Sequence, residues 1–182
     1  DNRILSLAAG STGIWVGKNN GLFFFDGITW TRYYMGNSSI PFDSIPRLYA
    51  KGSEVWIYSN TGIVYFNGNT FQQYNTLNSG LVSDSVECIF KDSGDTLWIG
   101  TRHGLSGFYG SAWTNYTPSN SALPDSFITT LIEDGNQYLF VGTKNVGLFI
   151  KSGNNFLDWY GCHHAGRGAL ALFKMQRGEI LF

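Results

Sequence analysis

The chain has 182 residues, a formal net charge of −1 and only 14% charged residues. This length is sufficient for one domain with a sizeable core, and the low charge provides no basic surface for nucleic acid or an anionic membrane. No run of 18 apolar residues is present, so no transmembrane helix and no membrane contact are expected. Two cysteines, Cys88 and Cys162, do not define a disulfide framework.

One short apolar sequence motif recurs along the whole chain. Its central residues Trp15, Trp56, Trp98 and Phe140 are spaced by 41, 42 and 42 residues, and the chain ends on an unfinished fifth copy. A period of about 40–45 residues that contains only short strands is typical of a β-propeller blade. We therefore predict an all-β fold, a β-propeller segment of four-stranded antiparallel blades. It is expected to form one segment over residues 1–182, with repeats at 4–44, 45–85, 86–127 and 128–168 and a partial copy at 169–182.

Each repeat predicts four strands in the same order. The first strands are expected at 4–8, 45–49, 86–90, 128–132 and 169–173, and the second at 14–17, 55–58, 97–100, 139–142 and 180–182. The third strands open with glycine at 21–25, 62–66, 104–108 and 147–150, and the fourth follow at 30–33, 71–74, 113–116 and 156–159. Asp26-Gly27 and Asn67-Gly68 predict tight hairpins before the fourth strand, because type I′ turns need positive φ. Pro46 falls within an expected strand, where it removes one ladder hydrogen bond.

Burial should differ among the four strands. The first three are nearly continuous apolar runs, as expected for strands packed on both faces between neighbouring blades. The fourth alternates aromatic and polar residues, which places it at the outer edge of the blade. The aromatic residues, 16% of the chain, are then expected to fill the gaps between blades, with Trp98 as a typical core residue.

The two ends of the sequence do not complement each other. The chain begins directly in a first strand and stops within a second one. We expect either a piece of a longer propeller or an assembly of copies. The unpaired terminal blade would expose an apolar face, which favours self-association or a protein partner.

The third repeat carries a recognisable motif. An acidic turn, Asp92-Ser93-Gly94-Asp95, precedes Leu97-Trp98-Ile99-Gly100-Thr101, and a Gly-Leu strand follows at Gly104. Residues 78–86 and 120–126 are loops of the same Asn-Ser type. The repeat resembles the two-component regulator propeller repeat. This resemblance implies a sensor propeller of a hybrid two-component system that detects carbohydrate, in the periplasm or outside a bacterial cell. Such repeats also occur in secreted and surface lipoproteins of unknown role.

The turns between the second and third strands vary most from repeat to repeat. They combine cationic, amide and imidazole side chains on one face of the scaffold, and binding loops on a rigid scaffold are where function usually lies. We expect them to bind a carbohydrate or a similar polar ligand, while the alternative is an ordinary solvated rim. The candidate ligand-binding residues are Lys18, Asn20, Asn60, Arg102, His103, Lys144 and Asn145.

Two further groups have less specific interpretations. Asp43, Asp84 and Asp125 each precede a serine just before a first strand, and their recurrence favours turn capping over a ring of ligand-binding carboxylates. Cys162-His163-His164 concentrates metal-ligand chemistry but lacks the spacing of a zinc motif.

No nucleophile elbow or phosphate-binding loop is present. We therefore predict a non-enzymatic recognition module without a cofactor. The alternatives are a protein-interaction or structural scaffold and a lyase or hydrolase that uses His163 and His164 with a metal.

Overall fold

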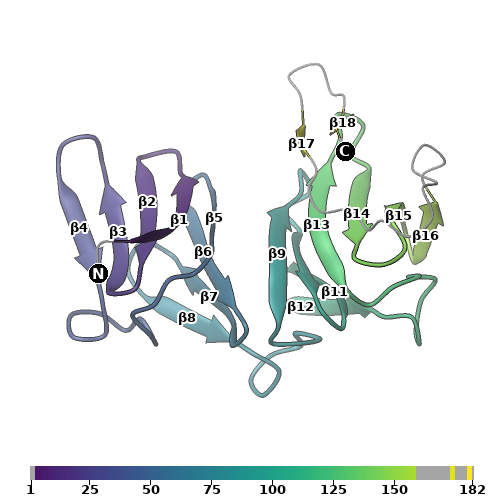
Figure 1. The fold of residues 1–182 in the computed structure, drawn as a ribbon, viewed down its shortest axis with the longest axis horizontal. Coiled ribbons are helices and arrows are strands. Elements are labelled where there is room, and N and C mark those ends of the chain that lie inside the picture. The colour runs from purple at the N-terminus through teal and green to yellow at the C-terminus, as the bar shows by residue number, and fades with distance from the viewer. Residues whose placement is uncertain (1–2, 159–172, 175–179, 182) are drawn as a thin grey trace. The chain divides into compact units, whose positions relative to one another are not determined.

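The structure is all-β over the residues that it describes and forms four-stranded antiparallel sheets, which confirms the predicted propeller-blade architecture (Figure 1). The computed structural model describes residues 3–158, 173–174 and 180–181. Among these residues, no helix has the length and apolarity needed to cross a bilayer.

Blade one contains β1 (Ile4–Ala9), β2 (Ile14–Lys18), β3 (Gly21–Phe25) and β4 (Trp30–Tyr33). Blade two contains β5 (Leu48–Lys51), β6 (Glu54–Ser59), β7 (Gly62–Phe66) and β8 (Phe71–Tyr74). Blade three contains β9 (Val86–Lys91), β10 (Leu97–Thr101), β11 (Gly104–Tyr109) and β12 (Ala112–Tyr116). Blade four contains β13 (Ile128–Glu133), β14 (Leu139–Thr143), β15 (Leu148–Ser152) and β16 (Asn155–Asp158).

The expected fifth copy is described only in part. The short strands β17 (Phe173–Lys174) and β18 (Ile180–Leu181) form an antiparallel pair. The rest of that copy lies outside the described residues, as do Trp159 and the Cys162-His163-His164 segment.

The blades fall into two compact units, Asp1–Asn75 with blades one and two and Thr76–Phe182 with blades three and four. The expectation of one segment over residues 1–182, with the repeat boundaries given above, stays a prediction.

Strand order within each blade follows the chain, so the fourth strand is an edge strand in all four blades. This order arises because each strand pairs antiparallel with the next through a short connection. Every residue of β10 and β14 is buried, and β7 is buried at all but one residue. By contrast, β4 is largely exposed. The expected difference between the first three strands and the fourth holds in blades two, three and four, whereas β1 in blade one has no buried residue.

Aromatic side chains fill the space between blades one and two. Trp15 and Tyr33 of blade one face Phe66 of blade two, with ring centroids 5.6 and 5.0 Å apart. Phe71 completes the group at 5.6 Å from Tyr33 and 4.4 Å from Phe66. Aromatic pairs in such geometries contribute about 0.5–1.5 kcal/mol beyond the area that they bury.

The second unit repeats this arrangement with one replacement. Trp98 and Tyr116 of blade three lie 6.1 Å apart, and Phe156 of blade four meets Tyr116 edge-on at 5.8 Å. Trp98 is 8% exposed and belongs to this core, as predicted. Where blade two has Phe66, blade four has Lys151. The register supports this equivalence, because Lys151 pairs with Phe156 as Phe66 pairs with Phe71.

The hairpins before the fourth strands differ from the expected two-residue turns in blades one and two. There the loops contain four residues, 26–29 and 67–70, between the flanking strands. Asp26 Oδ1 accepts hydrogen bonds of 2.7 Å from the amides of Ile28 and Thr29, and Asn67 Oδ1 accepts the matching pair in blade two. These side chains replace part of the backbone turn, so the glycines still take positive φ but in a longer loop.

The prediction that Pro46 interrupts a strand was wrong. Strand β5 begins at Leu48, two residues after Pro46. A proline at that position cannot donate to a ladder, so pairing starts beyond it. The expected strand at 45–49 is therefore shorter at its beginning.

One face of blade one remains open to solvent. Leu7, Ile14 and Trp30 are 61%, 47% and 60% exposed. They occupy the register positions that in blade two are taken by Leu48, Val55 and Phe71, which pack into the core of the first unit.

Candidate functional site

Two turns of the second unit are closed by buried threonine hydroxyls. Thr101 Oγ1 donates to Gly104 O at 2.8 Å between β10 and β11, and Thr143 Oγ1 donates to Gly147 O at 3.0 Å between β14 and β15. Both threonines are completely buried. Gly104 and Gly147 have φ of +142° and +121°, which favours glycine. In each turn, the residues between the threonine and the glycine therefore have a well-defined backbone conformation.

Each of these turns is bonded to the loop that enters its own blade. Arg102 N donates to Ser85 O at 3.1 Å, and Lys144 N donates to Phe127 O at 2.9 Å. Phe127 thus occupies in blade four the position that Ser85 occupies in blade three. This change places an aromatic ring beside the turn, where the preceding repeat has only a hydroxyl.

Arg102 and Lys144 converge on that ring. The Arg102 guanidinium carbon lies 5.5 Å and Lys144 Nζ 4.6 Å from the centroid of Phe127, so both cations make cation–π contacts with one side chain. Arg102 Nε also pairs with Glu87 Oε1 at 2.6 Å. We call Arg102, Lys144 and Phe127 the rim cluster. It contains two cations, with one adjacent carboxylate, around a half-buried aromatic ring.

The remaining second-unit candidates border the rim cluster. His103 Nδ1 shares a 3.1 Å hydrogen bond with Ser83 Oγ, and its amide donates to Thr101 Oγ1. Asn145 N donates to Asp125 Oδ2 at 2.9 Å. The strand-connecting turns and the loops that enter the blades therefore meet at one end of the second unit.

The first-unit candidates lie in the corresponding turns of blades one and two. Lys18 Nζ lies 5.1 Å from the ring centroid of Phe23, and the carbonyl oxygen of Asn20 accepts a 3.0 Å bond from Arg32 Nε. Asn60 is exposed in the turn between β6 and β7. Lys18 and Arg32 share Phe23 in the way that Arg102 and Lys144 share Phe127, although Arg32 comes from an edge strand.

The recurring aspartates act as caps. Asp43 Oδ1 accepts the amide of Met35 at 2.8 Å, and Asp84 Oδ1 accepts the amide of Thr76 at 2.7 Å. Asp125 bonds Phe127 N with one oxygen and Asn145 N with the other. The interpretation as turn caps is confirmed. Within the part of the chain that the structure describes, no group of three or more His, Cys, Asp or Glu side chains is arranged to hold a metal ion.

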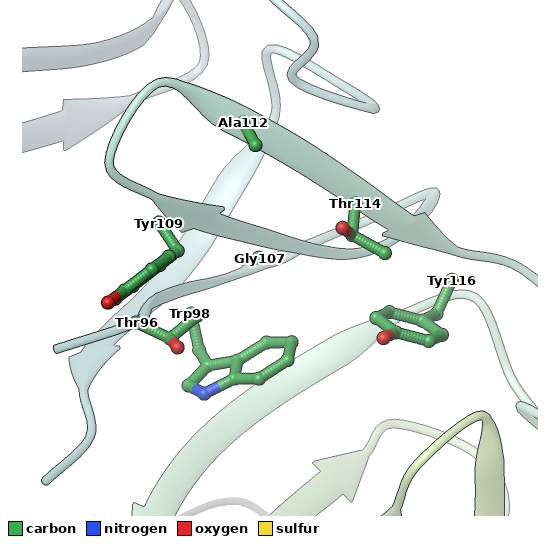
Figure 2. Close-up of a pocket in the computed structure, with 7 residues that line it drawn as sticks. All are labelled: Thr96, Trp98, Gly107, Tyr109, Ala112, Thr114 and Tyr116. Atoms are coloured by element: carbon green, nitrogen blue, oxygen red, sulfur yellow. The ribbon is translucent and has the colours of Figure 1, made fainter. Parts of the chain in front are cut away.

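Sequence reasoning missed a pocket on blade three. Its cavity of about 320 Å³ is lined by Thr96, Trp98, Gly107, Tyr109, Ala112, Thr114 and Tyr116. Figure 2 shows Gly107 without a side chain between the rings of Trp98, Tyr109 and Tyr116. The available signal was Gly107 itself, which interrupts an apolar third strand where blades one and two have Phe24 and Tyr65.

The comparisons with known proteins agree with this architecture. The model of the two component regulator propeller family matches residues 80–103, which extend from the loop before blade three to His103. A comparison with curated proteins found no match. The chain is a β-propeller segment, and its residues 80–103 match the two-component regulator propeller repeat that the resemblance indicated.

Solved structures of the same fold come from two settings. The extracellular domain of BT3049 from B. thetaiotaomicron, assigned to a hybrid two component system, is 23% identical with a TM-score of 0.79 over 99% of this chain and 27% of its own. The extracellular domain of BT4673 from the same organism, assigned to a one component system, is 17% identical with a TM-score of 0.73 over 99% of this chain and 26% of its own. Virginiamycin B lyase from Staphylococcus aureus is 14% identical with a TM-score of 0.75 over 98% of this chain and 63% of its own.

These likenesses establish the fold. The chain spans about a quarter of the length of the two extracellular domains. The same architecture occurs in a lyase, so the fold alone does not separate recognition from catalysis. Function has to be argued from the sites.

Proposed function

We propose that this chain is a non-catalytic recognition segment of a bacterial sensor propeller, located in the periplasm or outside the cell, that binds a carbohydrate or another polar ligand. The convergence of Arg102 and Lys144 on Phe127 carries this proposal. The family repeat at residues 80–103 and the likeness to extracellular domains of bacterial signalling systems support it.

The rim cluster has the chemistry that a polar ring ligand requires. Guanidinium and ammonium groups donate hydrogen bonds to hydroxyl or carboxylate oxygens, and an aromatic ring stacks against the apolar face of a sugar. Because the turns are closed by buried threonines, these groups need little ordering when a ligand arrives, and preorganisation favours affinity. His103 and Asn145 add polar groups beside the rim cluster, at the same end of the second unit. Lys18, Asn20 and Asn60 are proposed to play the corresponding part in the first unit.

Glycan binding to the full chain tests this function. We expect saturable binding of at least one glycan, and Arg102→Ala and Lys144→Ala should each weaken it about tenfold, as the loss of one charge-assisted hydrogen bond would. Lys51→Ala is the matched control. It removes an exposed lysine at the end of β5, where β5 meets the beginning of β6 and far along β6 from the turn that holds Asn60.

Equal losses in the Lys51 control and the rim variants would contradict a local site. The absence of any saturable glycan binding, together with a molecular mass that rises with concentration, would favour the alternative of a protein-interaction or structural scaffold. Leu7, Ile14 and Trp30 on the open face of blade one are the observation that favours this second function. Light scattering at several protein concentrations measures it directly.

A further inference from the structure

The pocket on blade three lies beside a residue that is aromatic in blades one and two and glycine in blade three. In blade one Phe24 pairs with Trp15 and Thr31, and in blade two Tyr65 pairs with Trp56 and Gln72. Blade three has Trp98 and Thr114 at the flanking positions, but residue 107 between them is glycine. The sheet therefore keeps the two outer members of this cross-strand row and lacks the central one.

Blades one and two carry an aromatic ring at this position, whereas blade four has Ile150. The Phe24 ring lies 4.4 Å from Trp15 at an interplanar angle of 33°, and the Tyr65 ring lies 4.4 Å from Trp56 at 27°. Both are flat rings nearly parallel to the tryptophan. The Phe24 ring also approaches Gly13, whose counterpart two residues before Trp98 is Thr96, a residue of the pocket wall.

We propose that this pocket binds a small phenolic compound, whose ring lies beside Trp98 and whose hydroxyl bonds to the pocket's own hydroxyl groups. A flat ring fits because the pocket replaces a phenyl group in one blade and a phenol in the next. A cavity of about 320 Å³ is large enough for one such ring with substituents. The wall supplies hydroxyl groups from Thr96, Tyr109, Thr114 and Tyr116.

The Trp98 side chain is held in one position at the inner wall of the pocket. A Cβ at residue 107 would lie 2.8 Å from Trp98 Cζ3, so the indole lies directly against the bare backbone of this residue. Trp98 is fixed from its other end, because its Nε1 donates to Asp92 Oδ2 at 2.7 Å. A ligand must therefore lie beyond the indole, toward Tyr109, Thr114 and Tyr116 (Figure 2).

This site shares no residue with the rim cluster, so its test is independent of the proposed function. The probe is p-cresol, titrated into the full chain by calorimetry and followed through the indole N–H signal of Trp98, assigned with Trp98→Phe. We expect saturable binding with a Kd on the order of a millimolar, as for a fragment of this size. 4-Methylcyclohexanol, which keeps the hydroxyl but is not flat, should bind at least about tenfold more weakly.

Two variants locate the site. Thr114→Trp places a large side chain into the pocket from an exposed edge strand, and it should weaken p-cresol binding at least about tenfold. Thr31→Trp is the matched control, since it makes the same change at the same position of blade one, where Phe24 already fills the row. It should change the Kd by less than about twofold.

Tyr109→Ala provides a second readout if Thr114→Trp does not fold. Tyr109 is 61% exposed, so its removal opens the wall with little effect on the core, and p-cresol binding should weaken about threefold or more. Unchanged binding in both pocket variants would overturn the proposal. So would equal affinity for the flat and the puckered ring, or no saturable binding of p-cresol.

Discussion

Replacing Lys151 with phenylalanine should stabilise the second unit. Lys151 occupies the position of Phe66 beside an apolar core, and its Nζ lies 4.6 Å from the ring centroid of Trp98 and 4.4 Å from that of Tyr116. Nζ also donates to Gly153 O at 2.7 Å. Phe66 in the first unit is 2% exposed and contacts the equivalent rings. The surrounding side chains should therefore accept a ring at residue 151.

The magnitude follows from the contacts that are lost and gained. Lys151→Phe loses two cation–π contacts of about 1 kcal/mol each and one solvent-facing hydrogen bond of about 1 kcal/mol. It gains about 2 kcal/mol of apolar burial and about 2 kcal/mol from ring pairs with Trp98, Tyr116 and Phe156. The free energy of unfolding should rise by about 1 kcal/mol. Lys151→Ala loses the same contacts and gains none, so it should cost about 3 kcal/mol.

Urea unfolding of the full chain, followed by tryptophan fluorescence, measures these differences. Amide hydrogen exchange in β14 and β15 assigns the change to the second unit. The reciprocal variant Phe66→Lys is the control, and it should cost at least about 1 kcal/mol because it reverses this exchange at the equivalent and fully buried position. If Lys151→Phe destabilises the chain as much as Lys151→Ala does, the two positions are not equivalent and the reasoning fails.

Two further predictions concern the same unit. Burial lowers the pKa of Lys151, an effect that the Asp92 carboxylate partly opposes. Between this lowered pKa and the ordinary value of 10.5, the unfolded chain binds more protons than the folded one, so this residue's contribution to stability rises with pH. Unfolding free energies at several pH values should show this rise in the native chain relative to Lys151→Met, and parallel pH profiles would contradict it. Gly100→Ala should lower the free energy of unfolding in urea by about 3 kcal/mol or more. The reason is that a Cβ there would lie 2.4 Å from Cys88 Sγ and 2.7 Å from Ile128 Cγ2. A loss below about 1 kcal/mol would contradict this, because it would show that these neighbours move aside easily.

Most of the fold could be predicted because it repeats. The motif around Trp15, Trp56, Trp98 and Phe140 correctly predicted the second strand of every blade, and the alternation of aromatic and polar residues predicted the fourth strands. The hairpin loops were less accessible. Asp26 carries the signal of a two-residue turn, but its carboxylate bonds to Ile28 N and Thr29 N and supports a longer loop. Local side-chain hydrogen bonds of this kind compete with the backbone pattern.

The candidate site was only partly predictable. The variable turns identified Arg102 and Lys144, but not Phe127, the ring on which both converge. Phe127 is an apolar residue directly before an apolar strand, so the sequence alone suggests a core residue. Its role depends on contacts between two blades, which no single repeat encodes. Gly107 was missed for the opposite reason, since a pocket made by an absent side chain leaves only a glycine in the sequence.

The strand order within the blades also has a kinetic consequence. Every ladder of the four blades joins strands that follow each other in the chain. The ladder contacts are therefore local for an all-β protein, and low contact order is associated with fast folding. Hairpins form within microseconds, whereas the cores around Trp15 and Trp98 need two blades to meet. Rings within one blade, such as Trp15 and Phe24, can meet when that blade forms, whereas the contacts of Trp15 and Tyr33 with Phe66 require both blades.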